Sequence, residues 1–127
     1  MKKLCAVICF IAAPTWAQVN PNEIVRFTGF LGNLQLSAAD VRADVMDAED
    51  DTSQIAIAMN EDATAAFFGF TKRHLNQTVT MFVCGEEVLS ATLQATVDTG
   101  FAMTGPLPDD RAAAMADALN GLGECPR

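Results

Sequence analysis

The chain has 127 residues and a formal net charge of −8, with 16 acidic against eight basic side chains. A surface this negative repels phosphate backbones and anionic lipid headgroups, so the composition argues against nucleic-acid and membrane-surface binding. The length is that of one domain with a modest hydrophobic core.

The first 17 residues have the layout of a secretory signal peptide. Two lysines precede an apolar run at 4–13, and the small residues Thr15 and Ala17 predict cleavage before Gln18. The run is half the length of about 20 residues that a membrane-spanning helix needs. The alternative is a buried N-terminal helix. We therefore expect a periplasmic or secreted protein after cleavage near Ala17, with no transmembrane segment in the mature chain.

Removal of this leader takes away Cys5 and Cys9 and leaves Cys84 and Cys125. Two cysteines in an exported protein favour one disulfide bond. Such a bond would close a loop of roughly 40 residues and stabilise the fold by about 4 kcal/mol in the chain-entropy model. Two free thiols, or a two-thiolate metal site lacking other ligands, are the alternatives.

Residues 18–35 are predicted to be a polar lead-in followed by a first strand at 24–30 (IVRFTGF), where β-branched and aromatic residues gather. Glycines then interrupt the pattern, and residues 37–40 can form one helical turn. Residues 41–46 alternate with period two, and 53–59 is the return strand of a hairpin. The acidic tip of this hairpin has neither the glycine nor the ligand spacing of an EF-hand calcium loop, which favours a solvated turn.

A helix is predicted to begin after Asn60, whose side chain can cap it, with two acids in the first turn. Its buried stripe is expected to be Ala63, Ala66, Phe67 and Phe70. His74 follows two basic residues in the last turn, where positive charge complements the helix dipole, and is predicted to lie on the surface. Asn76 can end the helix in the left-handed conformation.

The stretch 79–91 (VTMFVCGEEVLSA) reads as a hairpin that turns at Cys84 and Gly85. Residues 88–97 could form one bent strand or two short ones, and 101–104 another short strand. Pro108 suits the first position of a last helix. The buried stripe of that helix is expected to comprise Ala112, Met115, Ala116 and Leu119. The order β-β-β-α-β-β-β-α predicts an α+β domain, a mostly antiparallel sheet with two helices packed on one face.

No combination of residues in the chain is typical of catalysis. His74 is the single histidine, and the sequence has no CxxC pair, GxSxG elbow, phosphate-binding loop or GxGxxG motif. We therefore expect a protein that is not an enzyme, with no catalytic residues, no cofactor and no metal site.

The segment from Phe67 to Gly123 resembles the head subdomain of the first periplasmic domain of SecD and SecDF, auxiliary subunits of the bacterial protein-export channel. The matching positions are Phe67 and Thr71, Gly85, Val88-Leu89-Ser90-Ala91, Gly100, Thr104-Gly105, and the Ala112, Met115, Ala116, Leu119 helix. The upstream hairpin also fits, so the resemblance covers about residues 36 to 123, and 36–127 is predicted to be a head-like domain.

Several positions depart from the family pattern. Asn76 stands in place of a glycine, Cys84 in place of an aspartate and Thr92 in place of a proline. The membrane bundle that carries proton-coupled work in SecDF is absent from this sequence, so the resemblance does not imply a motor function. It implies the head alone, which in the family is thought to contact emerging polypeptide.

The leading functional hypothesis is a non-catalytic periplasmic binding module for a polypeptide or a partner protein of the cell envelope, accessory to protein export or envelope assembly. The candidate contact surface is the hairpin tip, Gly85, Glu86, Glu87 and Val88. One alternative is a small-molecule binder or small enzyme with a pocket between sheet and helices. Another is a structural periplasmic protein that shares only the fold.

Overall fold

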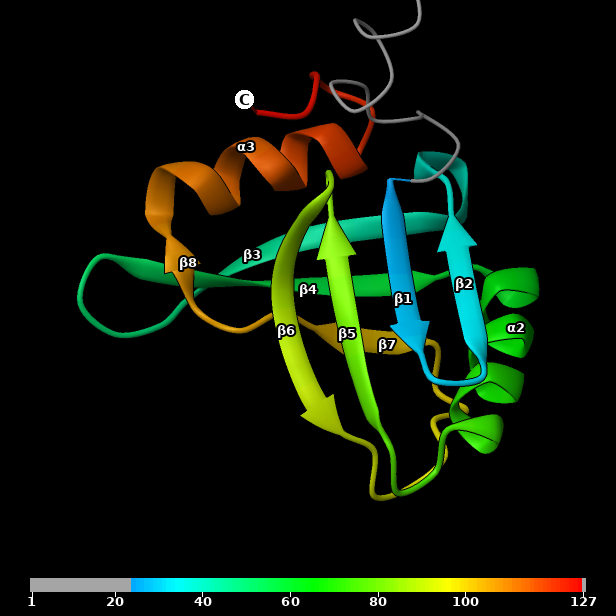
Figure 1. The fold of residues 1–127 in the computed structure, drawn as a ribbon. Helices are drawn as coiled ribbons and strands as arrows, with labels where there is room; N and C mark the ends of the chain where they lie inside the picture. The colour runs from blue at the N-terminus through cyan, green and yellow to red at the C-terminus, as the bar shows by residue number, and fades with distance from the viewer. Residues whose placement is uncertain (1–23, 127) are drawn as a thin grey trace, which may run out of the picture.

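A computed structural model describes residues 24–126, which form two antiparallel sheets and two α-helices (Figure 1). The predicted leader and its cleavage site lie outside the described residues. The α+β class with mostly antiparallel strands is confirmed. The strands are divided between two sheets, one in front of the other in Figure 1, with their strands crossing at a steep angle.

The first sheet has the strand order β2-β1-β5-β6. Its strands are β1 (Val25–Gly29), β2 (Gly32–Leu36), β5 (Thr78–Val83) and β6 (Glu86–Thr92). Phe27 pairs with Leu34 on one side and with Met81 on the other, and these side chains face the core. Strand β2 was not predicted, because its glycine and polar residues do not give the apolar–polar alternation by which a strand is recognised in sequence.

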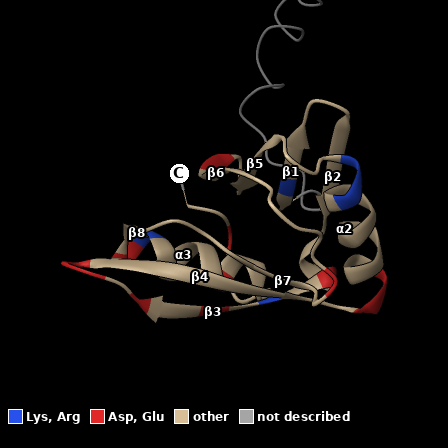
Figure 2. Cartoon of the chain, turned by 90° about the horizontal axis from the view of Figure 1, so that it is seen from below, with Lys and Arg blue, Asp and Glu red and all other residues tan. Residues whose placement is uncertain are grey.

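The second sheet has the order β3-β4-β7, with a two-residue strand β8 also paired to β4. Its strands are β3 (Val41–Asp47), β4 (Thr52–Met59), β7 (Phe101–Met103) and β8 (Leu107–Pro108). Ile55 and Ile57 of β4 are fully buried, because their face of the sheet looks toward the first sheet and the helices. No other described element covers the opposite face of β3 and β4 (Figure 2).

Helix α2 (Glu61–Arg73) begins where predicted. The Oδ1 atom of Asn60 accepts a hydrogen bond from the N–H of Ala63 at 2.8 Å, which satisfies one of the free donors of the first turn. Phe67 packs on Phe27 with ring centroids 4.7 Å apart. Ala66, predicted to be buried, is exposed because the helix contacts the sheets along a narrower stripe.

Helix α3 (Asp109–Leu119) lies above the β3 and β4 strands in Figure 1 and contacts both. Its predicted stripe is buried, together with Ala118. Pro108 precedes the helix as its N-cap residue and also pairs with Thr52 as part of β8, so the helix starts one residue later than predicted.

Candidate functional site

The β5–β6 hairpin turns on two residues with left-handed backbones, Cys84 at φ +55° and Gly85 at φ +81°. Two successive positive φ values are the geometry of a tight hairpin turn whose twist matches the flanking strands. Gly85 adopts this conformation at little cost, whereas Cys84 needs support from its surroundings. Part of that support is the hydrogen bond that the Cys84 N–H donates to the carbonyl of Ile24 at 2.9 Å.

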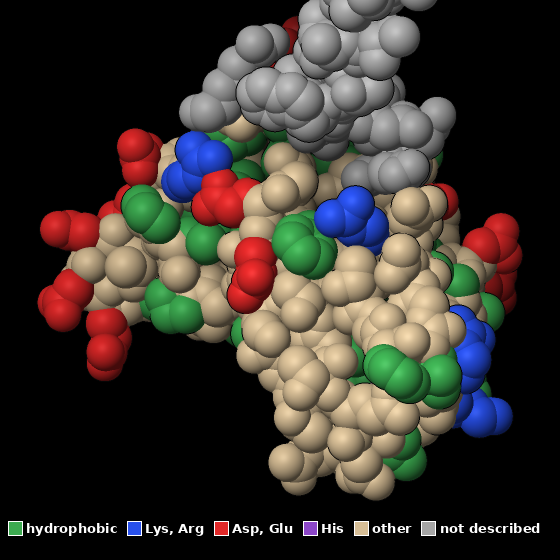
Figure 3. All heavy atoms as spheres, viewed as in Figure 1, with side chains coloured by type: hydrophobic (Ala, Val, Ile, Leu, Met, Phe, Trp, Pro, Cys, Tyr) green, Lys and Arg blue, Asp and Glu red, His purple; other side chains and the backbone are tan. Residues whose placement is uncertain are grey.

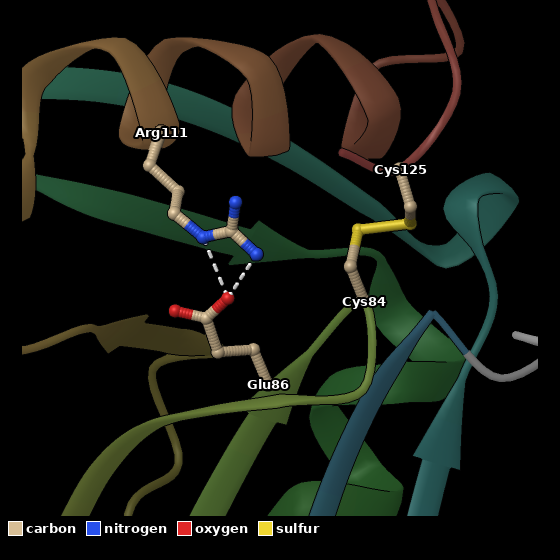
Figure 4. Close-up of a disulfide and its surroundings, with 4 residues drawn as sticks. All are labelled: Cys84, Glu86, Arg111 and Cys125. Carbon is tan, nitrogen blue, oxygen red and sulfur yellow. Dashed lines mark hydrogen bonds and ion pairs between the residues drawn. A yellow bond between two sulfur atoms is a disulfide. The ribbon is translucent and has the colours of Figure 1, made fainter. Parts of the chain in front are cut away.

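Cys84 is joined to Cys125 by a disulfide bond, with Cα atoms 5.6 Å apart and a separation of 41 positions in sequence (Figure 4). The bond links the hairpin turn to the segment that follows α3. The two ends of the predicted disulfide therefore lie together in the structure, and the turn is held against the C-terminal helix.

Glu86 forms an ion pair with Arg111 of α3 beside the disulfide (Figure 4). The Nε–H of Arg111 donates to Oε1 of Glu86 at 2.6 Å, and the NH2 group contacts the same oxygen. The hydrogen bond to Glu86 raises the pKa of the Arg111 guanidinium. Each side chain is about one third exposed, so the pair lies at the surface, where ion pairs contribute little to stability.

The four residues of the predicted contact surface differ in accessibility. Gly85 and Glu87 are exposed, Glu86 is half-buried in its ion pair, and Val88 is buried. The carbonyl of Val88 accepts a hydrogen bond from the N–H of Gly105 at 2.9 Å. Glu86 and Val88 are thus occupied by contacts within the fold. The exposed part of the hairpin is Leu89 to Thr92.

This exposed stretch is a free edge of the first sheet. The N–H of Leu93 donates to the carbonyl of Gln77 at 3.0 Å, and main-chain groups alternate in direction along an antiparallel ladder. The N–H and C=O groups of Ser90 and Thr92 therefore point away from β5. Figure 1 shows β6 as the outermost strand of its sheet.

The edge strand β3 of the second sheet is different. The side chain of Asn120 accepts a hydrogen bond from the N–H of Ala43 at 2.8 Å and donates one to its carbonyl at 2.9 Å. Asn120 thus occupies the outward main-chain groups of Ala43, which an added strand would use. At the far edge of the first sheet, β2 lies against α2.

His74 is fully buried, and the prediction that it lies on the surface is wrong. Its Nδ1 donates to the carbonyl of Phe70 at 2.9 Å, and its Nε2 accepts from the N–H of Leu31 at 3.0 Å. This arrangement requires a neutral ring with the proton on Nδ1. The β1–β2 turn folds over the helix end and covers the ring. Leu31 and His74 are 43 positions apart in sequence, so no local sequence pattern predicts this contact.

A hollow of about 400 Å³ lies beside β3. Its lining is Ala38, Val41, Arg42, Ala43, Asp44, Asn120 and Leu122. It holds one carboxylate and one guanidinium from neighbouring positions and no nucleophile or histidine, so it offers no acid–base pair for catalysis. Among residues 24–126, no three His, Cys, Asp or Glu side chains lie close enough together to hold a metal ion. No helix in this range has the length and apolar character needed to cross a bilayer.

Neither a family model nor a curated protein sequence matches the chain. Two solved structures match its fold. One is a structure of SecDF, described as a membrane component that enhances protein export, with a TM-score of 0.62 and 12% identity, and the match covers 96% of this chain and 56% of that one. The other is SecDF in a form described as super-membrane-facing, with a TM-score of 0.61 and 11% identity, covering 96% of this chain and 17% of that one.

The chain therefore spans about half the length of the first structure and about a sixth of the second. At this identity the likeness shows the fold and not the activity. The resemblance read from the sequence is confirmed at that level: residues 24–126 have a fold found in SecDF.

Proposed function

We propose that this protein is a non-catalytic binding module that captures extended polypeptide outside the cytoplasm, in support of protein export or envelope assembly. The observation that carries the proposal is the free edge of β6 on a fold shared with a protein described as enhancing export. The disulfide fits an oxidising compartment.

Extended peptides bind free sheet edges by adding a strand, with main-chain hydrogen bonds supplying affinity. On β6 the outward groups of Ser90 and Thr92 provide two N–H donors and two C=O acceptors. The Gly105–Val88 hydrogen bond closes the edge at its start, and the edge opens beyond that point. The docked strand would lie beside Ser90 to Thr92.

Side chains along the edge favour a ligand of low charge. Leu89 is 38% exposed, and the hydroxyls of Thr80 and Ser90 lie 3.4 Å apart across the two strands. Glu87 at the start of the edge would attract a basic side chain of the ligand. An extended, mostly uncharged polypeptide segment with a basic residue near one end fits this surface.

Replacement of Ser90 by proline tests the proposal. Proline removes the outward N–H but leaves the β5–β6 ladder intact, because proline is tolerated on an edge strand whose N–H faces solvent. The probe is reduced and alkylated lysozyme, a basic unfolded chain that an acidic protein does not repel. We expect Ser90→Pro to lose binding at least tenfold, and the control Ser90→Ala, which keeps the N–H, to bind as the wild type does.

Equal binding by Ser90→Pro and the wild type, with both correctly folded, would show that the β6 edge is not the capture site. A photo-crosslinking side chain placed at position 90 in cells can then identify the natural ligand. The same probe at the exposed Leu122 is the control. Capture of many unfolded chains at Ser90 alone supports the proposal, and equal capture at both positions contradicts it.

A further inference from the structure

The β1–β2 turn and the end of α2 together form a projecting apolar tip with a basic flank, which we call the α2-end patch. Its residues are Phe30, Leu31, Lys72, Arg73 and Leu75. We propose that this patch docks the protein on a bilayer surface that contains anionic phospholipid. This surface lies apart from the β6 edge and goes beyond peptide capture.

The apolar part of the patch projects into solvent. Phe30 is 87% exposed and Leu31 56%, both at the tip of the β1–β2 turn, and Leu75 is 40% exposed just after α2. Large apolar side chains at a turn tip contribute nothing to the core. Contiguous exposed apolar groups of this kind mark interaction surfaces.

The tip is held rigidly by His74. Its Nε2 accepts the Leu31 N–H, and its Nδ1 is fixed by the carbonyl of Phe70 inside α2. Gly29 allows this close approach, because a Cβ atom there would lie 2.3 Å from Cδ2 of His74. The exposed pair is therefore displayed at a fixed height above the helix end, and docking need not order a mobile loop.

The flank of the patch is basic. Lys72 and Arg73 are exposed in the last turn of α2, and the ion pair found among residues 24–126 involves Glu86 and Arg111 instead. Lys72 places its ammonium 5.3 Å from the ring centroid of Phe68, which keeps the charge beside the apolar surface. Figure 3 shows apolar and basic side chains side by side in this region.

The total charge argues against a membrane surface, but Lys72 and Arg73 are not beside the main acidic cluster. Figures 2 and 3 show acidic side chains at the tip between β3 and β4, at the far end of the molecule, and further ones beside α2. Those on α2 are Glu61 and Asp62 in its first turn, roughly 16 Å along the helix axis from Lys72. Strand β4 has eight residues, so it separates this tip from α2 by roughly 26 Å. That separation is about three Debye lengths at physiological salt, so the acidic tip is screened from a surface that contacts the patch.

The shape of the patch favours a lipid surface over a protein ligand. A polypeptide segment binds in a groove or along an edge, whereas Phe30 and Leu31 form a convex tip, and the hollow described above is lined by β3 residues and the segment after α3. Apolar tips insert at the boundary between headgroups and acyl chains, and neighbouring lysine and arginine side chains contact lipid phosphates. Acidic Asp98 lies on the loop that contacts α2 through Val97 and Thr71, and it should oppose this binding weakly.

The test is sedimentation with vesicles, using protein recovered from exporting cells with its N-terminus established by mass spectrometry. Vesicles of phosphatidylcholine with 30% phosphatidylglycerol are compared with pure phosphatidylcholine at 0.15 M salt. The tip variant is Phe30→Ser with Leu31→Ser, which keeps the Leu31 N–H for His74. The charge variant is Lys72→Gln with Arg73→Gln, and Leu122→Ser, 76% exposed elsewhere, is the control.

We expect binding to the anionic vesicles only. The affinity of the tip variant for these vesicles should fall at least tenfold, because apolar area is removed from the tip. The affinity of the charge variant should fall about fivefold for each charge removed, and that of the control should not change. Absence of binding to anionic vesicles, or equal binding by the tip variant and the wild type, overturns the proposal, and so does selective retention by an acidic protein in place of lipid. Because the variants leave β6 unchanged, binding of the unfolded peptide probe can be measured on the same samples. The result tests the peptide-capture proposal independently of vesicle binding.

Discussion

The side chain of Asn120 makes both main-chain hydrogen bonds that a neighbouring strand would make with Ala43. Asn120 follows α3, 77 positions away in sequence, so it joins the helix end to the edge of the second sheet. Free edges are sites of unwanted pairing, and natural sheets protect them in several ways. Asn120 therefore protects the middle of the β3 edge, whereas no such side chain occupies the outward groups of Ser90 and Thr92 on β6 among the described residues.

Replacement of Asn120 by alanine should lower the free energy of unfolding by about 1–2 kcal/mol, because two hydrogen bonds to the main chain are lost. The uncovered β3 edge should also promote self-association that grows with concentration. Denaturant unfolding and light scattering measure the two effects. Asn33→Ala, on an exposed part of β2, is the matched control, and identical behaviour of the two variants contradicts the assigned role.

Gly29 should tolerate no side chain. Its Cβ atom would lie 2.3 Å from the buried His74 ring, so Gly29→Ala should destabilise the fold by about 2–3 kcal/mol. A Cβ atom at Gly69 on α2 would make an ordinary van der Waals contact with the flexible Arg73 side chain at 3.8 Å, so Gly69→Ala should stabilise the fold by about 0.5–1 kcal/mol. Adding His74→Ala to Gly29→Ala should recover part of the loss. Strict additivity of the two substitutions in denaturant unfolding would show that the ring is not the obstacle.

The disulfide should matter more than the ion pair beside it. Conversion of Cys84 and Cys125 together to serine should reduce the free energy of unfolding by about 4 kcal/mol, because the 41-residue separation gives the unfolded chain a long constrained loop. Glu86→Gln should produce a much smaller change, since the pair is exposed. Unfolding with and without reductant measures the first effect, and an unchanged midpoint after full reduction would contradict it.

Asp40 should make stability depend on pH in the acid range. The Ser37 N–H donates to its carboxylate at 2.9 Å, and this hydrogen bond lowers the pKa of Asp40 below its ordinary 3.8. A lowered folded-state pKa contributes stability above the unfolded pKa and loses it as pH falls through the folded value. Asp40→Asn should therefore be less stable than the wild type at pH 7, and the difference should shrink as the pH falls below 3.8 and through the lowered folded-state pKa.

Urea unfolding at several pH values measures this difference. Asp117→Asn, at an exposed position of α3, is the control for the loss of one negative charge. A gap between wild type and Asp40→Asn that stays constant from pH 7 to pH 2 would falsify the role of the Ser37 hydrogen bond.

Local chemistry in the sequence determined most of the elements. The Asn60 cap, the Phe67 and Phe70 stripe and the turn at Cys84 and Gly85 all appear where predicted. Asn76 has the left-handed backbone expected of it, at φ +66°. These features depend on neighbours within about four residues, so the sequence carries them directly.

The candidate surfaces depended on contacts between distant segments. The sequence placed Gly85 to Val88 at a hairpin tip, but only the fold brings Arg111 to Glu86 and Gly105 to Val88, which leaves Ser90 and Thr92 as the open edge. Periodicity could not show that His74 lies under the β1–β2 turn, because the basic residues beside it favour the prediction of an exposed helix end.

The division into two sheets and the placing of the β3–β4 acidic tip far from Lys72 and Arg73 both depend on long-range packing. Alternation along a strand tells which residues share a face, but pairing partners and crossing angles depend on how all faces pack together. The sequence by itself determined an α+β chain of capped helices and hairpins with two cysteines available for pairing. Tertiary structure alone decided that Asn120 covers the groups of Ala43 on β3 and which side chains meet at the α2-end patch, because those positions are fixed by long-range packing.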